Sequence, residues 1–144
     1  MIVYLDTSSL VKLYVEEAGS DAVRRLVSEA EKIAASVIAY PEARSALARR
    51  RREGGLSASD HRSAGAAFES DWRRLVRVGV TETLCRAAAG LAERHALKAL
   101  DSLHLASFLA LRRRLPRQRV AFSSYDKRLN RAAGRARRAS VSHS

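Results

Sequence analysis

Four short apolar runs, separated by longer segments with helical patterns, constrain the fold of this chain more than any other feature. Three of them, at residues 2–5, 33–36 and 120–122, are almost continuously apolar, whereas the one at residues 76–80 alternates valine with Arg77 and Gly79. Continuous apolar runs of this length are typical of strands that are buried on both faces of a parallel sheet, with helices as the crossovers. We therefore predict an α/β fold in which a short parallel central sheet carries helices on both faces.

The length of 144 residues, with 47% hydrophobic residues, suits one domain with a core of its own. We place this domain at residues 1–133. A helix is expected over residues 37–52, although Pro41 lies close to its first turn, and a short last helix is expected after Asp126. Residues 134–144 are basic and then Ser-rich, so we expect this tail to fray, and only Val141 hints at a final strand.

The composition also predicts the compartment. No apolar run approaches the ~20 residues that a membrane-spanning helix needs, and the first residues show neither a basic leader nor a cleavage site. Cys85 is the single cysteine, so it has no partner for an internal disulfide. We expect a cytoplasmic protein without membrane contact.

The chain is strongly basic, with a formal net charge of +12 and a pI near 11.1. This balance indicates a polyanionic partner, either nucleic acid or an acidic protein, although arginine could also be the default surface cation of a GC-rich genome. The distribution favours a partner, because residues 112–138 contain eleven Arg or Lys and one acid. Candidate RNA contacts are Arg49, Arg50, Arg112 and Arg113.

Four acidic residues stand apart from the mixed charges of the helix surfaces. Asp6 and Asp126 follow predicted strands, Glu42 lies near a helix start, and Asp101 lies inside an apolar helix. In parallel sheets, ligands bind outside the carboxyl ends of the strands. Buried carboxylates need compensation, which either separate Arg or Lys partners or one shared divalent cation could provide.

A shared cation explains the whole set best, because oxygen ligands without His or Cys suit Mg²⁺ or Mn²⁺. Metal ions held by carboxylates can activate water and stabilise the charge that develops on a phosphodiester. No protein nucleophile is then needed. A basic rim would hold the phosphate backbone on either side of the acidic centre.

Four motifs around these acids resemble those of PIN-domain nucleases. They are Asp6-Thr7-Ser8-Ser9-Leu10, Ser36 followed by Glu42, Leu100-Asp101-Ser102-Leu103-His104-Leu105-Ala106, and Ser124-Tyr125-Asp126-Lys127-Arg128-Leu129. Their order and spacing agree with the family over roughly residues 1–133. The short length and the last motif look most like VapC-type toxins of toxin–antitoxin modules.

This resemblance implies a Mg²⁺- or Mn²⁺-dependent endoribonuclease in a PIN-like fold. Asp6, Glu42, Asp101 and Asp126 would bind metal or position the attacking water. Ser8 and Ser124 would support Asp6 and the metal through hydrogen bonds. The resemblance also implies a homodimer and inhibition by a cognate antitoxin protein.

Other functions fit the sequence less well. A haloacid dehalogenase-type phosphatase needs a second Asp at the position of Ser8, and a receiver domain needs adjacent early acids and a late Lys. The remaining alternative is a catalytically silent PIN-like module that binds RNA or protein. Such a module would gain nothing from four buried carboxylates.

Three further interpretations concern single residues. The spacing of His61, His95 and His104 does not suggest zinc. His104 follows Asp101 by three residues and could border the pocket, but we expect a packed or solvent-capped histidine. Cys85 is expected in the core. Trp72 and Phe68 are expected to anchor the core or a dimer surface rather than to stack on bases.

Overall fold

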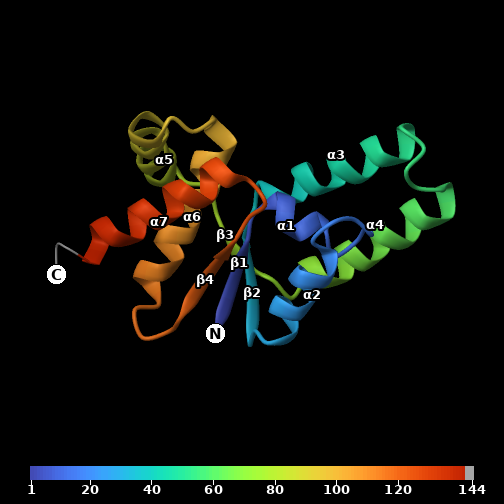
Figure 1. Cartoon of the computed structure of the whole chain (residues 1–144), viewed down its shortest axis with the longest axis horizontal. Coiled ribbons are helices and arrows are strands. Elements are labelled where there is room, and N and C mark those ends of the chain that lie inside the picture. The colour runs from blue at the N-terminus through green and yellow to red at the C-terminus, as the bar shows by residue number, and fades with distance from the viewer. Residues whose placement is uncertain (142–144) are drawn as a thin grey trace.

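The computed structural model describes residues 1–141 and consists of three layers, with a parallel sheet between two groups of helices (Figure 1). The strands are β1 (Ile2–Leu5), β2 (Lys32–Ser36), β3 (Val76–Val78) and β4 (Val120–Ser123). All neighbouring pairs are parallel, in the order β3-β2-β1-β4. The predicted α/β class is confirmed.

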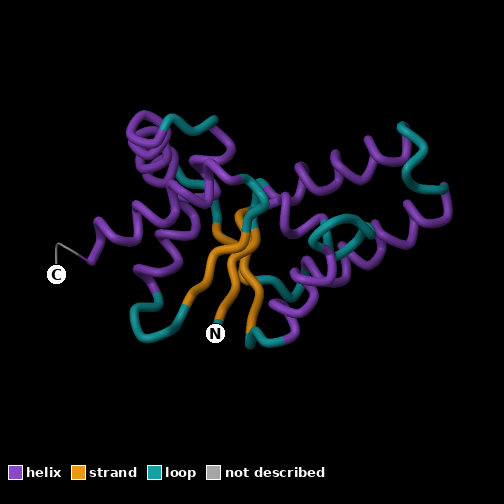
Figure 2. The backbone as a smooth tube through the Cα atoms, in the orientation of Figure 1, coloured by secondary structure: helices purple, strands orange, loops and turns teal. Residues whose placement is uncertain are grey.

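Helices cover both faces of this sheet (Figures 1 and 2). One face carries α1 (Thr7–Val11), α2 (Ser20–Ser28), α3 (Ala39–Arg52) and α4 (Ala58–Trp72). The other carries α5 (Glu82–His95), α6 (Ala99–Arg114) and α7 (Lys127–Val141). Every strand-to-strand connection therefore crosses through helices, as parallel pairing requires.

The central strand β1 explains why its sequence is apolar without alternation. Ile2 and Tyr4 pack into the core beneath α5, α6 and α7, whereas Val3 and Leu5 pack into the core beneath α1 to α4. All four side chains are buried. A strand between two helical layers has no solvent face, so both sets of alternating positions are apolar.

Four predicted boundaries differ from the structure. The second strand begins one residue earlier, at Lys32, and the fourth ends one residue later, at Ser123. The third strand ends at Val78 rather than at residue 80. The helix expected from residue 37 begins at Ala39, after a turn. Pro41 lies in the first turn of α3, where a missing N–H removes no intrahelical hydrogen bond.

The prediction of a short last helix and a frayed basic tail is wrong for residues 134–141. Helix α7 continues through Gly134 to Val141, and no strand forms there. The reason is packing: Ala132 and Ala133 are buried and Ala136 contacts the same core cluster, which outweighs the ~1 kcal/mol that a helical glycine costs relative to alanine. Residues 142–144 of the predicted tail lie outside the described residues.

None of the helices within residues 1–141 is long and apolar enough to cross a membrane.

Candidate active site

The four predicted acids all lie at the beginnings of helices. Asp6 follows β1 and caps α1, Glu42 and Asp101 occupy the first turns of α3 and α6, and Asp126 directly precedes α7. The N-terminus of a helix carries a partial positive charge that stabilises a nearby carboxylate. Each acid therefore has a local source of stabilisation, and none needs an arginine partner to be tolerated.

Asp6 is the best-fixed of the four. Its side chain is buried, and it accepts hydrogen bonds on both carboxylate oxygens. Ser8 Oγ donates to Oδ1 at 2.7 Å, the Ser9 backbone N–H donates to Oδ1 at 3.0 Å, and Ser124 Oγ donates to Oδ2 at 2.6 Å. Ser8 and Ser124 thus hold the Asp6 carboxylate in one orientation.

Asp126 is exposed, which corrects the expectation that all four acids are buried. It lies in the loop beyond β4, and its Oδ1 accepts from the Leu129 backbone N–H at 2.9 Å, as a helix cap does. Ser124 Oγ also accepts from the Asp126 backbone N–H at 3.0 Å. One serine hydroxyl therefore connects Asp6 to the loop that carries Asp126.

Glu42 is half-buried and is held by two donors. Thr7 Oγ1 donates to Glu42 Oε1 at 2.8 Å, and His104 Nε2 lies 2.9 Å from the same oxygen. Burial by itself raises the pKa of Glu42, but the hydrogen bonds from His104 and Thr7 outweigh burial, and the pKa lies below its ordinary value. Glu42 is therefore a carboxylate at neutral pH.

Asp101 is half-buried, and no hydrogen bond from the described residues reaches its carboxylate oxygens. Its pKa is raised, first by burial and then by the negative charge of Asp126; His104 opposes this rise, and Asp6 and Glu42 add smaller effects that raise the pKa. The other three acids thus lie within electrostatic reach of Asp101. The fold brings the four predicted residues into one acidic cluster.

The donor chemistry of this acidic cluster (Asp6, Glu42, Asp101 and Asp126) fits a hard divalent cation. All ligands are carboxylate oxygens, which Mg²⁺ and Mn²⁺ accept. Within residues 1–141, no three His, Cys, Asp or Glu side chains already surround a common ion position. A cation bound by these carboxylates would relieve the repulsion that raises the pKa of Asp101.

The family becomes clear from sequence comparison. The model of the PIN domain family matches residues 3–135, which is most of the chain. The chain belongs to the PIN domain family. Two curated relatives, Ribonuclease VapC45 of Mycobacterium tuberculosis strain CDC 1551 and Ribonuclease VapC49 of strain H37Rv, are each 38% identical over 110 residues, 76% of this chain and 76% of theirs. The predicted VapC-type resemblance is confirmed.

Solved structures share the fold of this PIN domain. VapC20 of Mycobacterium tuberculosis, a toxin that cleaves the sarcin-ricin loop, aligns with a TM-score of 0.61 at 20% identity over 86% of this chain and 91% of its own. FitAcB of Neisseria gonorrhoeae aligns with a TM-score of 0.62 at 18% identity, over 93% of this chain and 94% of its own. VapBC2 of Rickettsia felis, bound to a promoter DNA fragment, aligns with a TM-score of 0.56 at 16% identity, over 88% of this chain and 100% of the matched chain.

A cleft of about 490 Å³ adjoins the acidic cluster of this PIN domain. Glu42 lies in its lining with Thr7 and Ser8, and the basic residues of the lining are Lys12, Arg49 and Arg50. Glu17 binds two of these cations, Lys12 through Oε1 at 2.9 Å and Arg50 through Oε2. Arg49 has no ion pair among the described residues.

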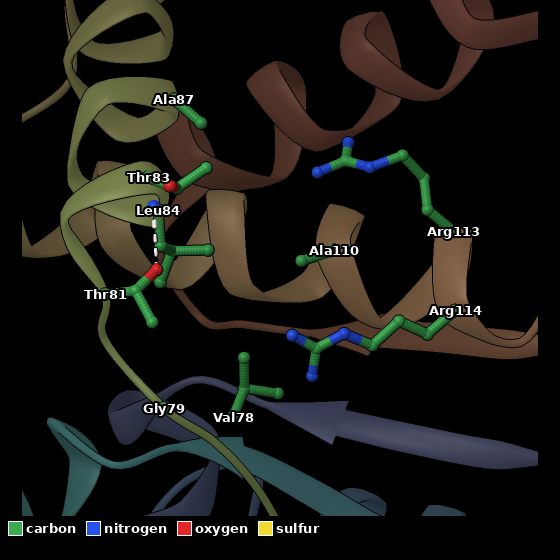
Figure 3. Close-up of a pocket in the computed structure, with 9 residues that line it drawn as sticks. All are labelled: Val78, Gly79, Thr81, Thr83, Leu84, Ala87, Ala110, Arg113 and Arg114. Atoms are coloured by element: carbon green, nitrogen blue, oxygen red, sulfur yellow. Dashed lines mark hydrogen bonds between the residues drawn. The ribbon is translucent and has the colours of Figure 1, made fainter.

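The other two predicted RNA contacts lie elsewhere. Arg112 and Arg113 are at the C-terminal end of α6, whereas Asp101 is at its beginning, so Arg113 lies about 18 Å along the helix from Asp101 at ~1.5 Å per residue. Arg113 and Arg114 line a separate hollow of about 280 Å³, and both guanidinium groups point toward the start of α5 near Thr81 and Thr83 (Figure 3). Contact between RNA and Arg112 or Arg113 stays a prediction.

Sequence reasoning missed several residues of the site. Thr7 and His104 hold Glu42, and Lys12 is buried beneath the ring of Tyr125, 4.4 Å from its centroid. Tyr125 follows Ser124 in the fourth motif, so the motif itself marked this position. Lys12 carried no signal, because it lies outside all four motifs.

Of the single-residue interpretations, two are confirmed and one is wrong. His104 is a packed histidine with 2% exposure, and Phe68 is buried in a ring cluster with Tyr40 and Trp72. Cys85 is exposed rather than in the core. Its neighbours Leu84 and Ala88 point inward, so the buried stripe of α5 leaves Cys85 outside.

Proposed function

We propose that this PIN domain is a toxin endoribonuclease that hydrolyses RNA phosphodiester bonds with water, using Mg²⁺ or Mn²⁺ held by Asp6, Glu42, Asp101 and Asp126. The acidic cluster at the helix starts carries this proposal, because a shared divalent cation would compensate the burial and the neighbouring negative charges that raise the pKa of Asp101. The ribonuclease names of the relatives at 38% identity support the reaction.

A divalent cation at this position supplies a water of lowered pKa and neutralises charge on the phosphate oxygens. The protein's contribution is to orient the carboxylates before the cation arrives. Ser8, Ser9 and Ser124 fix Asp6, while Thr7 and His104 fix one oxygen of Glu42. Glu42 Oε2, Asp126 Oδ2 and both oxygens of Asp101 accept no hydrogen bond from the described residues, so they are the oxygens we assign to metal or water.

The cleft beside Glu42 is the position we propose for the RNA backbone. Arg49 is the cation that can bind a phosphate there without first leaving an acid partner, whereas Lys12 and Arg50 share Glu17. Binding that depends on phosphate neutralisation weakens steeply as salt rises. RNA affinity that stays constant between low and high salt would remove these arginines from the proposal.

We also propose a cognate antitoxin protein as the inhibitor, a homodimer as the assembly and the cytoplasm as the compartment. The VapBC2 structure, which is bound to a promoter DNA fragment, supports a VapC-type chain acting with a partner protein. The exposed thiol of Cys85 fits a reducing compartment. Co-expression with the protein encoded beside this chain, followed by size-exclusion chromatography with light scattering, tests the partner and the assembly together.

The test of the reaction is cleavage of total cellular RNA by the purified protein without antitoxin. Reactions contain Mg²⁺, Mn²⁺ or EDTA, and Asp101→Asn is prepared identically as the control. We expect discrete fragments that require the metal and disappear with Asp101→Asn. Equal cleavage by both proteins would show that the acidic cluster does not carry the activity.

The absence of a ready-made group of three ligands within residues 1–141 favours a second candidate, a catalytically silent module that binds RNA or protein. Thermal unfolding with Mn²⁺ separates the two. A cation that binds only the folded state at 100 times its Kd stabilises the fold by about 2.7 kcal/mol. A silent module shows no such shift on addition of Mn²⁺, either in the wild-type protein or in Asp101→Asn.

A further inference from the structure

His104 connects the interior of the sheet to the acidic cluster. Its side chain is 2% exposed and lies on α6, one turn after Asp101. Its Nδ1 is 2.9 Å from the hydroxyl of Tyr4 on β1, and its Nε2 is 2.9 Å from Glu42 Oε1 and 3.1 Å from Thr7 Oγ1. A buried imidazole thus lies between a fully buried phenol and a half-buried carboxylate.

The positions of the protons in this chain follow from hydrogen-bonding chemistry. Oε1 of Glu42 lies 2.9 Å from His104 Nε2, and an ionised carboxylate only accepts hydrogen bonds, so His104 Nε2 is the donor. In the neutral imidazole, Nδ1 is then an acceptor, and the Tyr4 hydroxyl donates to it. Burial raises the pKa of Tyr4 far above its ordinary value, which keeps the proton on the phenol.

We propose that His104 is a positioning residue that aims Glu42 at the metal position, and that Tyr4 selects the imidazole tautomer needed for this. The inference rests on the proposed metal-dependent function. One helix supplies both Asp101 and the group that orients Glu42, so the ligands from α6 and α3 are placed relative to each other. Thr7 and His104 both bind Oε1, which leaves Oε2 open to a cation or its water.

Histidines and carboxylates in metal sites are oriented by such outer partners, and removal of one partner lowers metal affinity about 10- to 100-fold. Replacing a histidine that only fills space would not lower the metal affinity in this way. His104 also makes an edge contact with the Tyr4 ring, with centroids 6.1 Å apart. A leucine could occupy much of that volume without donating to Glu42, so shape and hydrogen bonding can be separated.

The experiment is a calorimetric titration of the folded, full-length protein with Mn²⁺ at pH 8. His104→Leu removes the donor, His104→Gln keeps an N–H close to the position of Nε2, and Tyr4→Phe removes the partner of Nδ1. His61→Gln and Tyr14→Phe are matched controls, because His61 lies on α4 and the Tyr14 hydroxyl donates to Asp71 at 2.9 Å on the other face of the sheet.

We expect His104→Leu to bind Mn²⁺ about 10- to 100-fold more weakly than the wild-type protein. His104→Gln should recover most of the affinity, and both controls should match the wild-type protein. If His104→Leu does not fold, the comparison of Tyr4→Phe with Tyr14→Phe carries the test. Equal Mn²⁺ affinity of the folded His104 or Tyr4 variants and the wild-type protein would overturn the inference.

The tautomer provides a readout that does not depend on metal. Imidazole nitrogen chemical shifts in the metal-free protein should show His104 with the proton on Nε2, and Tyr4→Phe should increase the form with the proton on Nδ1. A proton on Nδ1 in the wild-type protein would overturn the assignment. A wild-type protein that binds no Mn²⁺, but shows the expected tautomer, would instead refute the proposed function.

Discussion

Gly19 connects the turn before α2 to the loop that carries Ser124 and Asp126. It adopts a left-handed conformation with φ +92°, and a Cβ at this position would lie 2.6 Å from Cε1 of Tyr125. Tyr125 donates its hydroxyl to the Gly19 carbonyl at 3.2 Å and its backbone N–H to Ser8 Oγ at 3.0 Å. Gly19→Ala therefore perturbs the loop that holds Asp6 through Ser8 and Ser124.

The magnitude follows from three contributions. The left-handed backbone costs a non-glycine residue about 1–2 kcal/mol. The Tyr125 ring is 46% exposed, so it can move away from the new methyl group, losing a hydrogen bond of about 1 kcal/mol and its contact with the Lys12 ammonium, worth about 0.5–1 kcal/mol. We expect Gly19→Ala to lower the free energy of unfolding by about 2.5–4 kcal/mol.

Equilibrium unfolding in urea measures this change, and Gly54→Ala is the matched control. Gly54 also has a positive φ, +81°, but nothing lies within 4 Å of its Cβ position. The control should lose only the backbone contribution of about 1–2 kcal/mol. Mn²⁺ affinity should fall in Gly19→Ala and stay unchanged in Gly54→Ala. Equal losses of stability and equal Mn²⁺ affinities would refute the role of the Tyr125 contact.

Three further predictions follow from the site. Ser124→Ala removes a donor to Asp6, so Mn²⁺ affinity should fall about 10- to 100-fold in a titration, whereas Ser28→Ala, on exposed α2, should match the wild-type protein. The pKa of Asp101 is raised in the folded state, so the contribution of this carboxyl to metal-free stability falls as pH rises from its ordinary pKa through the raised one. Glu42, whose pKa is lowered, contributes a slope of the opposite sign. In urea unfolding with EDTA, Asp101→Asn should lose only the falling contribution, and a pH profile of stability identical to that of the wild-type protein would contradict the assignment. Arg49→Ala should weaken single-stranded RNA binding and reduce the salt slope by about 0.7, unlike Arg86→Ala, whose arginine pairs with Glu82.

The sequence determined the fold class and the members of the acidic cluster. Both rest on local patterns: a strand buried on two faces must be apolar throughout, and an acid directly after such a strand or at a helix start has few structural reasons to be there. The strand patterns of β1 and β4 alone were enough to predict that Asp6 and Asp126 lie at the carboxyl edge of the sheet. The topology of a parallel sheet then requires the ends of these strands to lie close together.

Only the tertiary structure decided how each acid is held. Asp126 is exposed while Asp6 is buried, although both follow strands. Asp6 comes directly after the central strand β1, whereas Ser124 and Tyr125 separate Asp126 from the end of the outer strand β4. Likewise α7 continues past Gly134 because alanines pack against the core. These outcomes depend on which surfaces meet across the fold, and a local pattern contains no information about the opposite surface.

The pairing of His104 with Glu42 is the clearest case. The two residues are 62 positions apart and belong to helices on opposite faces of the sheet, and the chain between them gives no sign that they meet. Residue types and spacings determined which chemistry the chain could carry. The packing of α3 and α6 on opposite faces of one sheet decided that Oε1 of Glu42 is held and Oε2 is left open, because hydrogen bonds between distant segments form only once the core has fixed their separation.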